Sequence, residues 1–70
     1  MEVVEPLDIE GLAMVGEVVE ARVVKERRGF VVEVKLRDGR VLRTRPMDRD
    51  GAELLYRSVA YYMSNPLVRG

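Results

Sequence analysis

The chain has 70 residues, 47% of them hydrophobic, and its 12 lysines and arginines balance its 12 aspartates and glutamates. This length accommodates one domain, residues 1–70, and the hydrophobic content is too high for a disordered chain. The zero net charge excludes a polycation, and the absence of cysteine and histidine excludes disulfides, thiolate chemistry and imidazole catalysis.

Targeting and membrane-spanning segments are not expected. No apolar run approaches the roughly 18 residues that span a bilayer, and the acidic N-terminal segment with Pro6 differs from a targeting peptide. We therefore expect a cytoplasmic protein without a membrane partner. The absence of glutamine and a charged content of 34% are typical of a thermophile protein.

Residues 1–16 form an N-terminal arm whose conformation the sequence leaves open. Residues 8–15 suit one or two turns of helix with Asp8 as the N-cap. Gly11 and Gly16 weaken such a helix, because glycine loses more backbone entropy than other residues when it is ordered. An extended arm is the alternative.

Residues 17–46 contain three valine-rich runs separated by two turn signals. The runs are residues 17–25, 30–36 and 40–45. Gly29 and Gly39 end the two turn sequences, and glycine readily takes the positive φ that tight turns need. Pro46 is expected to end the third strand, because proline cannot donate to a sheet ladder. The pattern predicts an antiparallel β-meander over residues 17–46.

The alternation of apolar and polar residues predicts the register of both hairpins. In the first hairpin, Val19 is expected opposite Leu36. In the second, Gly39 serves as the bulge glycine after a type I turn, which places Val34 opposite Leu42. A shift of one residue would move every valine to the other face. The predicted buried face comprises Val19, Ala21, Val23, Phe30, Val32, Val34, Leu36 and Leu42, together with Leu55, Val59 and Tyr62.

A helix is predicted over residues 50–64. Asp50 is the expected N-cap, with Asp48 as the alternative, because aspartate accepts hydrogen bonds from the first helical turn. Pro66 ends the helix, and residues 65–70 form a tail. Apolar residues recur on one side, so this helix is expected to cover the apolar sheet face. The predicted fold class is α+β, a three-stranded antiparallel β-meander packed against one C-terminal amphipathic helix.

The sequence offers little for catalysis. Ser58 and Ser64 lie in the predicted helix, and there is no histidine to activate them. Residues 48–51 resemble the start of a calcium loop, but Val59 occupies the twelfth position, where that loop needs an acid. We therefore expect a non-enzymatic binding module without catalytic residues, cofactors or a metal site.

The charges are unevenly distributed along the chain. Residues 1–26 hold seven acidic and two basic residues, a net charge of −5, whereas residues 27–49 hold eight basic and three acidic residues, a net charge of +5. On the predicted polar sheet face, Arg22, Glu33 and Arg43 share one cross-strand row. Such pairs contribute about 0.2–1 kcal/mol each. One interpretation of the arginines is therefore a solvated ion-pair network.

The functional interpretation is a phosphate-binding surface, because the guanidinium fork binds phosphate oxygens with two hydrogen bonds. It predicts binding to nucleic acid, DNA or RNA, or to a ribonucleoprotein surface. The residues assigned to this surface are Arg27, Arg28, Arg37, Arg40, Arg43 and Arg45. The acidic N-terminal segment would oppose this function by folding over the arginines and neutralising them.

The alternative function is protein association. Leu54, Ser58 and Tyr61 form an i, i+4, i+7 stripe on the helix side away from the sheet. Exposed leucine and tyrosine suit a homodimer or another protein partner. Burial beneath residues 1–15 is the other explanation of this stripe, because the apolar side chains of that segment also need a place to pack.

Overall fold

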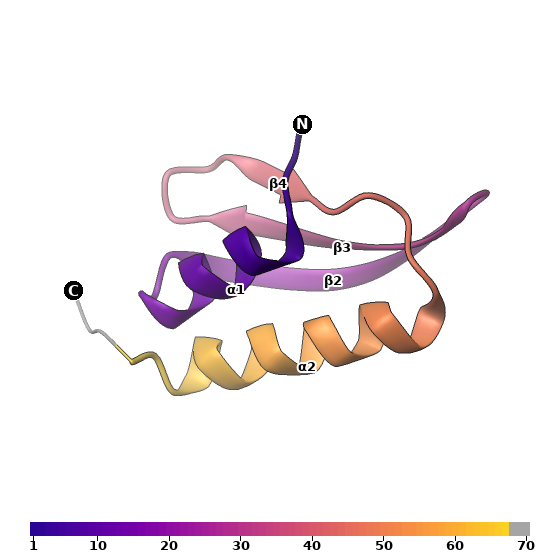
Figure 1. Ribbon diagram of the computed structural model, residues 1–70. Coiled ribbons are helices and arrows are strands. Elements are labelled where there is room, and N and C mark those ends of the chain that lie inside the picture. The colour runs from indigo at the N-terminus through magenta and orange to yellow at the C-terminus, as the bar shows by residue number, and fades with distance from the viewer. Residues whose placement is uncertain (68–70) are drawn as a thin grey trace.

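The computed structural model describes residues 1–67, which form one four-stranded mixed sheet and two helices (Figure 1). In chain order the elements are β1 (Glu2–Val3), α1 (Pro6–Met14), β2 (Val18–Glu26), β3 (Gly29–Leu36), β4 (Val41–Arg43) and α2 (Arg49–Ser64). The strand order is β1-β4-β3-β2, with β1 parallel to β4 and the other neighbours antiparallel. Residues 68–70 of the predicted tail lie outside the described residues.

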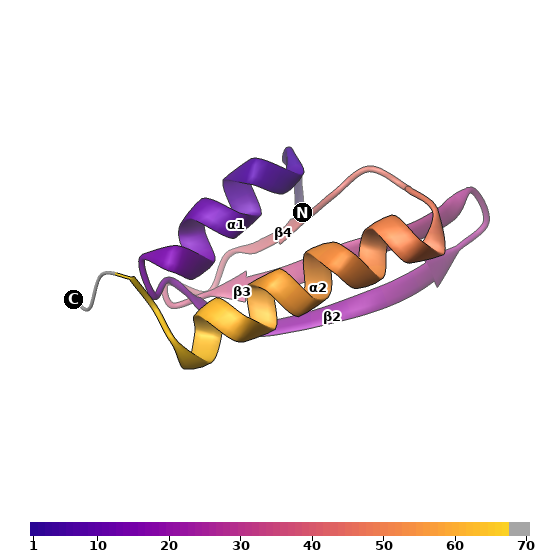
Figure 2. The ribbon, with the colours of Figure 1, turned by 60° about the horizontal axis from the view of Figure 1, so that its bottom comes forward.

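Both helices pack on the same face of the sheet (Figure 2). The predicted α+β class with a C-terminal helix is therefore confirmed, but the meander of β2, β3 and β4 is only part of the sheet. A short parallel strand, β1, and a second helix, α1, complete the fold. The buried core comprises Ile9, Ala13, Val18, Val32, Val34, Leu36, Leu42, Ala52, Leu55 and Val59, with Ala21, Val23, Phe30 and Tyr62 partly buried against it.

Both predicted hairpin registers are observed over most of their length. Val34 lies opposite Ala21 on one side and Leu42 on the other. Gly39 has a φ of +92°, and its N–H donates to the Leu36 carbonyl at 2.9 Å. This is the expected type I turn followed by a bulge glycine.

The predicted position of Val19 is wrong. Leu36 lies opposite Val18, and a β-bulge between Val18 and Glu20 shifts the register. Val18 is 6% exposed in the core, whereas Val19 is 41% exposed. The alternation of apolar and polar residues could not show which of the two valines is buried. Two adjacent valines fit the pattern equally well with or without the extra residue of a β-bulge.

Of the two conformations left open for residues 1–16, the structure shows the short helix, but Asp8 is not its N-cap. Helix α1 begins at Pro6 after the N-cap Glu5, and the Glu5 N–H donates to the Asp8 carboxylate at 3.3 Å. Proline favours this first helical position, because its fixed φ suits a helix and its missing N–H would have had no partner there. The residues of α1 that enter the core are Ile9 and Ala13.

Pro46 interrupts the sheet pairing but does not end it. Strand β4 stops at Arg43, and the chain pairs again at Met47, where Met47 and Phe30 exchange two backbone hydrogen bonds of 2.8 Å each. Gly29 has a φ of +144°, and a Cβ at this position would lie 2.6 Å from the Met47 carbonyl oxygen. Glycine is therefore required for the close approach of the two segments.

Asp48, the alternative N-cap, caps α2, so the preferred assignment to Asp50 is wrong. The Asp48 carboxylate accepts a hydrogen bond of 2.9 Å from the Gly51 N–H. The physical reason is the preceding bridge, which holds Met47 in an extended conformation and lets the helix begin directly afterwards. Asp50 instead lies in the first turn, where a negative charge favours the helix dipole.

Candidate binding surfaces

The sheet face opposite the helices carries the predicted polar rows. Arg22 lies opposite Glu33, and its guanidinium donates to one Glu33 carboxylate oxygen from Nε at 3.0 Å and from Nη2 at 2.6 Å. Glu33 is only 9% exposed and lies opposite Arg43 on its other side. The open face is therefore built around a sheltered carboxylate, not around free arginines.

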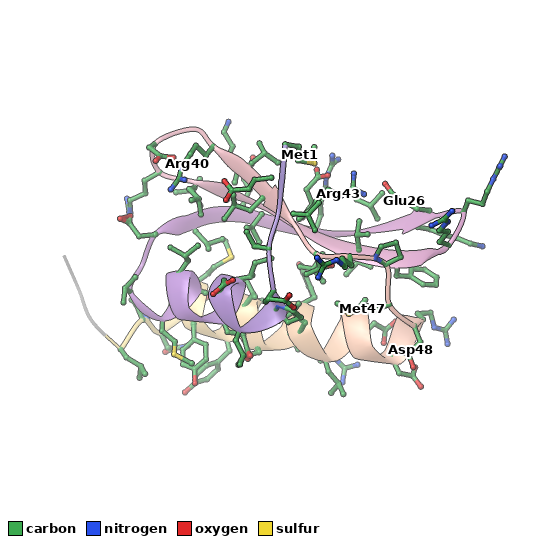
Figure 3. All side chains as sticks on the ribbon, turned by 45° about the horizontal axis from the view of Figure 1, so that its top comes forward. Met1, Glu26, Arg40, Arg43, Met47 and Asp48 are labelled. Carbon is green, nitrogen blue, oxygen red and sulfur yellow. The ribbon has the colours of Figure 1, made fainter. Side chains whose placement is uncertain are left out.

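Arg43 spans the sheet to reach Glu26 at the end of β2 (Figure 3). This ion pair joins the two strands that flank β3, so it must cross β3. Val31 alternates with Glu33 on that face and is nevertheless 0% exposed. The long side chains above it therefore act as a polar cover over an apolar patch.

Three more of the predicted arginines meet carboxylates of the N-terminal segment. The ion pairs are Arg45 with Glu5 at 3.1 Å, Arg37 with Glu17 at 3.8 Å and Arg40 with Glu2 at 3.9 Å. Each exposed pair contributes only about 0–1 kcal/mol. Together they show that carboxylates of the acidic N-terminal segment lie beside these arginines. This is the neutralisation that was expected to oppose phosphate binding.

Arg40 has a second carboxylate neighbour within its own turn. The Arg40 N–H donates to Asp38 at 3.0 Å, and its Nε does the same. The backbone hydrogen bond from Arg40 is the main cause that lowers the pKa of Asp38, with the Arg40 side chain adding to it. Asp38 in its charged form therefore stabilises the turn by accepting these two hydrogen bonds.

Arg27 and Arg28 differ from the other four predicted site residues. They form the tip of the β2–β3 hairpin, are exposed, and have no carboxylate within ion-pair distance in residues 1–67. Lys25, close to the tip on β2, is also exposed and unpaired within the described chain. Of the six predicted site arginines, two at the tip are therefore unpaired and four are paired. Lys25 joins the unpaired cations of the tip, although the sequence had indicated for it only a position opposite Phe30 in the sheet.

The predicted stripe on α2 is divided by α1. The Ser58 hydroxyl donates to the Glu10 carboxylate of α1 at 2.6 Å. Leu54 and Tyr61 remain 67% and 61% exposed, and Leu7 of α1 is 78% exposed. The N-terminal segment therefore covers the middle of the stripe and leaves its two apolar ends in solvent. The sequence analysis expected Leu7 to be buried with the other apolar side chains of residues 1–15, and it did not indicate Glu10, because the conformation of residues 1–16 remained open.

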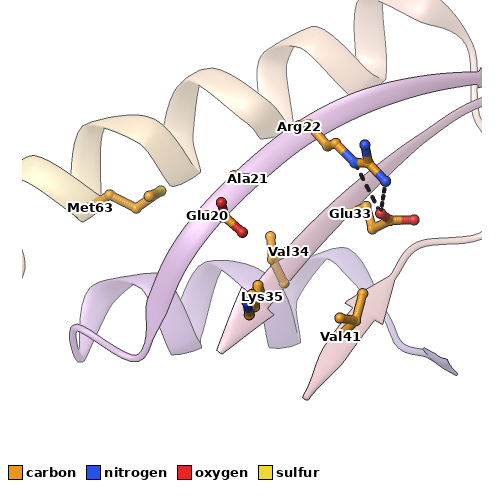
Figure 4. Close-up of a pocket in the computed structure, with 8 residues that line it drawn as sticks. All are labelled: Glu20, Ala21, Arg22, Glu33, Val34, Lys35, Val41 and Met63. Atoms are coloured by element: carbon orange, nitrogen blue, oxygen red, sulfur yellow. Dashed lines mark hydrogen bonds and ion pairs between the residues drawn. The ribbon is translucent and has the colours of Figure 1, made fainter. Parts of the chain in front are cut away.

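A shallow pocket of about 570 Å³ is lined by residues of β2, β3, β4 and α2 (Figure 4). Its lining includes Ala21 of β2, Lys35 of β3 and Met63 of α2. Every buried side-chain nitrogen or oxygen in residues 1–67 has a hydrogen-bond partner, so no described polar group is left buried and aimed at a ligand there. The same residues contain no group of three acidic, histidine or cysteine side chains that could hold a metal ion.

In comparisons with protein-family models, curated proteins and solved structures, the chain matched none. Neither helix in the described part of the chain is long and apolar enough to cross a membrane. Inferences about function therefore depend on the surfaces described above.

Proposed function

We propose that the chain is a non-enzymatic binding module that contacts the phosphate backbone of nucleic acid through the tip of the β2–β3 hairpin. The observation that carries this proposal is the contrast between the tip cations and the sheet arginines. Lys25, Arg27 and Arg28 are exposed and have no carboxylate within ion-pair distance in residues 1–67, whereas the arginines of the sheet are paired. Free cations bind phosphate without first losing another ion pair.

The shape of the hairpin supports the same function. The hairpin extends beyond the end of α2 (Figure 1), and a two-stranded ribbon of this kind fits the major groove of duplex DNA. Close to the tip, Phe30 exchanges two backbone hydrogen bonds with Met47, the residue that precedes the cap of α2. The tip is therefore both accessible and anchored to the folded body.

Three cations predict a modest, salt-dependent affinity. Each neutralised phosphate releases counterions, so the slope of log K against log salt is about −0.9 per contact and about −2.7 for three. Affinity should then fall about 40-fold between about 50 and 200 mM salt. This dependence distinguishes phosphate contact from binding through apolar surface.

The test is fluorescence anisotropy with labelled duplex DNA, duplex RNA and single strands at about 50 mM salt. Arg27→Glu and Arg28→Glu should each weaken binding and reduce the salt slope. Arg57→Glu is the matched control, because Arg57 is an exposed arginine of α2 that is also unpaired within residues 1–67. Equal losses in all three variants, or undetectable binding by the natural sequence, would contradict the proposal.

Protein association remains a second candidate, because exposed apolar side chains flank the seam between α1 and α2. Leu7, Leu54 and Tyr61 support it, since large apolar groups exposed together commonly mark interaction surfaces. If a second copy binds there, the solution mass should exceed 8.0 kDa and fall on Leu54→Glu. A mass that does not respond to Leu54→Glu would exclude this surface as the site of self-association.

A further inference from the structure

Strand β2 is a long, unpaired edge of the sheet. The strand order places it at one end, with β3 as its neighbour, and it has nine residues. The opposite edge is β1, with only two residues. Exposed edge strands present free N–H and C=O groups that can pair with another chain, and proteins usually keep such edges short or covered.

The hydrogen bonds of β3 show which groups of β2 point outward. Phe30 exchanges both of its backbone bonds with Met47, away from β2. Val32 likewise accepts from the Thr44 N–H and donates to the Thr44 hydroxyl, at 3.0 Å each. In an antiparallel ladder, directly opposite residues bond either to each other or outward on both sides.

The β2 residues opposite these two must therefore direct their N–H and C=O groups away from β3. They are Lys25, opposite Phe30, and Val23, opposite Val32. By alternation, Ala21 does the same. No hydrogen bond to these outward groups occurs among residues 1–67.

The edge is also sterically accessible at Ala21. Its small side chain lies between Glu20 and Arg22, which point to the open face, and Met63 on the helix side (Figure 4). The pocket of about 570 Å³ includes this part of β2 and extends across β3 to Val41 of β4. At Ala21 itself the strand carries only a methyl group, so the bulky neighbour that a second strand would meet there is Met63.

We propose that β2 pairs with β2 of a second copy of this chain, antiparallel about a two-fold axis at Ala21, to form a continuous eight-stranded sheet. This inference goes beyond the proposed function and does not depend on it. About a two-fold axis perpendicular to the sheet, each residue faces a residue of the partner, and the two residue numbers add up to the same value for every pair. This sum is even, because directly opposite side chains lie on the same face of the sheet.

Charge favours the Ala21 axis over the axes at Arg22 and Val23, and Glu26, which would face the partner's Arg22 for an axis at Val24, is already paired with Arg43. An axis at Ala21 places Glu20 opposite the partner's Arg22, twice by symmetry. An axis at Arg22 would place two arginines opposite each other, and an axis at Val23 would place Glu20 opposite the partner's Glu26. Opposite charges in directly opposed positions stabilise a ladder, whereas like charges destabilise it.

Two exposed groups gain partners in this arrangement. Glu20 has no cation within ion-pair distance in the described chain, and the Arg22 side chain is 71% exposed although it binds Glu33. The same register brings Val19, which is 41% exposed, beside the partner's Val23. Val19 is the extra residue of the β-bulge, so the regular part of the shared ladder ends at the Glu20–Arg22 pairs.

The test is the solution mass of the full chain, measured by sedimentation across protein concentrations up to about 1 mM. We expect a monomer–dimer equilibrium between 8.0 kDa and twice that mass. Glu20→Lys should weaken the dimer, because it places a second cation opposite the partner's Arg22. Glu2→Lys is the matched control, since it makes the same charge change at the opposite edge of the sheet.

Ala21→Pro is the second disrupting variant. It removes an N–H that points outward, so the monomer ladder keeps its bonds while the dimer loses the two central ones. Amide exchange by NMR gives a readout that does not depend on variants. The Ala21 and Val23 amides should exchange freely in dilute monomer and become protected as the dimer forms.

A mass of 8.0 kDa at every concentration would overturn the proposal. So would a dimer that survives both Glu20→Lys and Ala21→Pro, or one whose Ala21 amide stays unprotected. A dimer lost on Leu54→Glu but not on Glu20→Lys would assign self-association to the outer helix surface instead.

Discussion

Replacement of Gly29 by alanine is expected to destabilise the fold by about 3 kcal/mol. A φ of +144° costs a residue with a Cβ about 1–3 kcal/mol, and here the Cβ would also lie 2.6 Å from the Met47 carbonyl oxygen. Relieving that clash separates Met47 from Phe30 and loses two hydrogen bonds, each contributing about 0.5–1.5 kcal/mol. A domain of this size has a total stability of roughly 4–10 kcal/mol, so the loss is large.

The assay is urea and thermal unfolding followed by circular dichroism. A loss of about 3 kcal/mol should lower Tm by about 12–24 °C in a domain of this length. Gly39→Ala is one matched control, because Gly39 has a φ of +92° but no atom within 4 Å of its added Cβ. Gly11→Ala is the other, since Gly11 lies in α1 with no atom within 4 Å of the Cβ.

The three substitutions should rank in a fixed order. Gly39→Ala should cost only the backbone strain, about 1–3 kcal/mol, and Gly11→Ala should stabilise the protein by about 0.5–1 kcal/mol. If Gly29→Ala costs no more than Gly39→Ala, the contact with Met47 contributes nothing, and the reasoning about the bridge is wrong.

Two further predictions concern the caps and turns. Asp48→Ala should cost about 1 kcal/mol of unfolding free energy through loss of the α2 cap, and Asp50→Ala should cost less, as urea unfolding can show; equal costs would contradict the assignment of the cap. NMR titration should give Asp38 a pKa below its ordinary value of 3.8. Because this pKa is lowered on folding, the stabilising contribution of Asp38 is present above pH 3.8 and is lost as the pH falls through the lowered value. Asp38→Asn should therefore remove part of the acid dependence of stability, and an unchanged dependence would refute the effect.

The hairpin registers were predictable because both faces of the sheet constrain them. Ala21 opposite Val34 and Arg22 opposite Glu33 sort apolar and charged residues at once, and a shift by one residue would exchange them. The Val18–Val19 pair carries no such constraint, since either valine fits the buried position. The bulge there depends on the path of the chain from α1, which alternation does not encode.

Other features depend on contacts between distant segments. Asp48 and Asp50 are equally good caps in sequence, and the Met47–Phe30 bridge decides between them. Strand β1 has two residues and no pattern of its own, so only its pairing with β4 defines it. Pro6 did provide a local signal for the start of α1, as a favoured first helical residue, but the glycines nearby obscured it.

The candidate site was predicted as a set of arginines without their partners. The partners come from far along the chain, as with Glu5 and Arg45, which are 40 residues apart. Segment charges of −5 and +5 indicate attraction between the two regions but not which cations remain free. In the described structure Arg27 and Arg28 are left unpaired, because Glu26, the acid next to them in the chain, pairs with Arg43 instead.

The dimer and the hairpin tip together predict how salt dependence varies with protein concentration. An axis at Ala21 directs the two hairpins in opposite directions, and about 6.5 residues at about 3.3 Å each separate the axis from each tip. The tips then lie roughly 43 Å apart, somewhat more than the roughly 34–36 Å between successive major grooves on one side of duplex DNA. Below the dimerisation threshold the salt slope should be about −2.7, and in the dimer it should approach about −5.4, because about six phosphates are contacted. Glu20→Lys should keep the shallow slope at every concentration while leaving each tip intact. A steep slope in that variant would show that the two surfaces are not linked by pairing of the β2 strands.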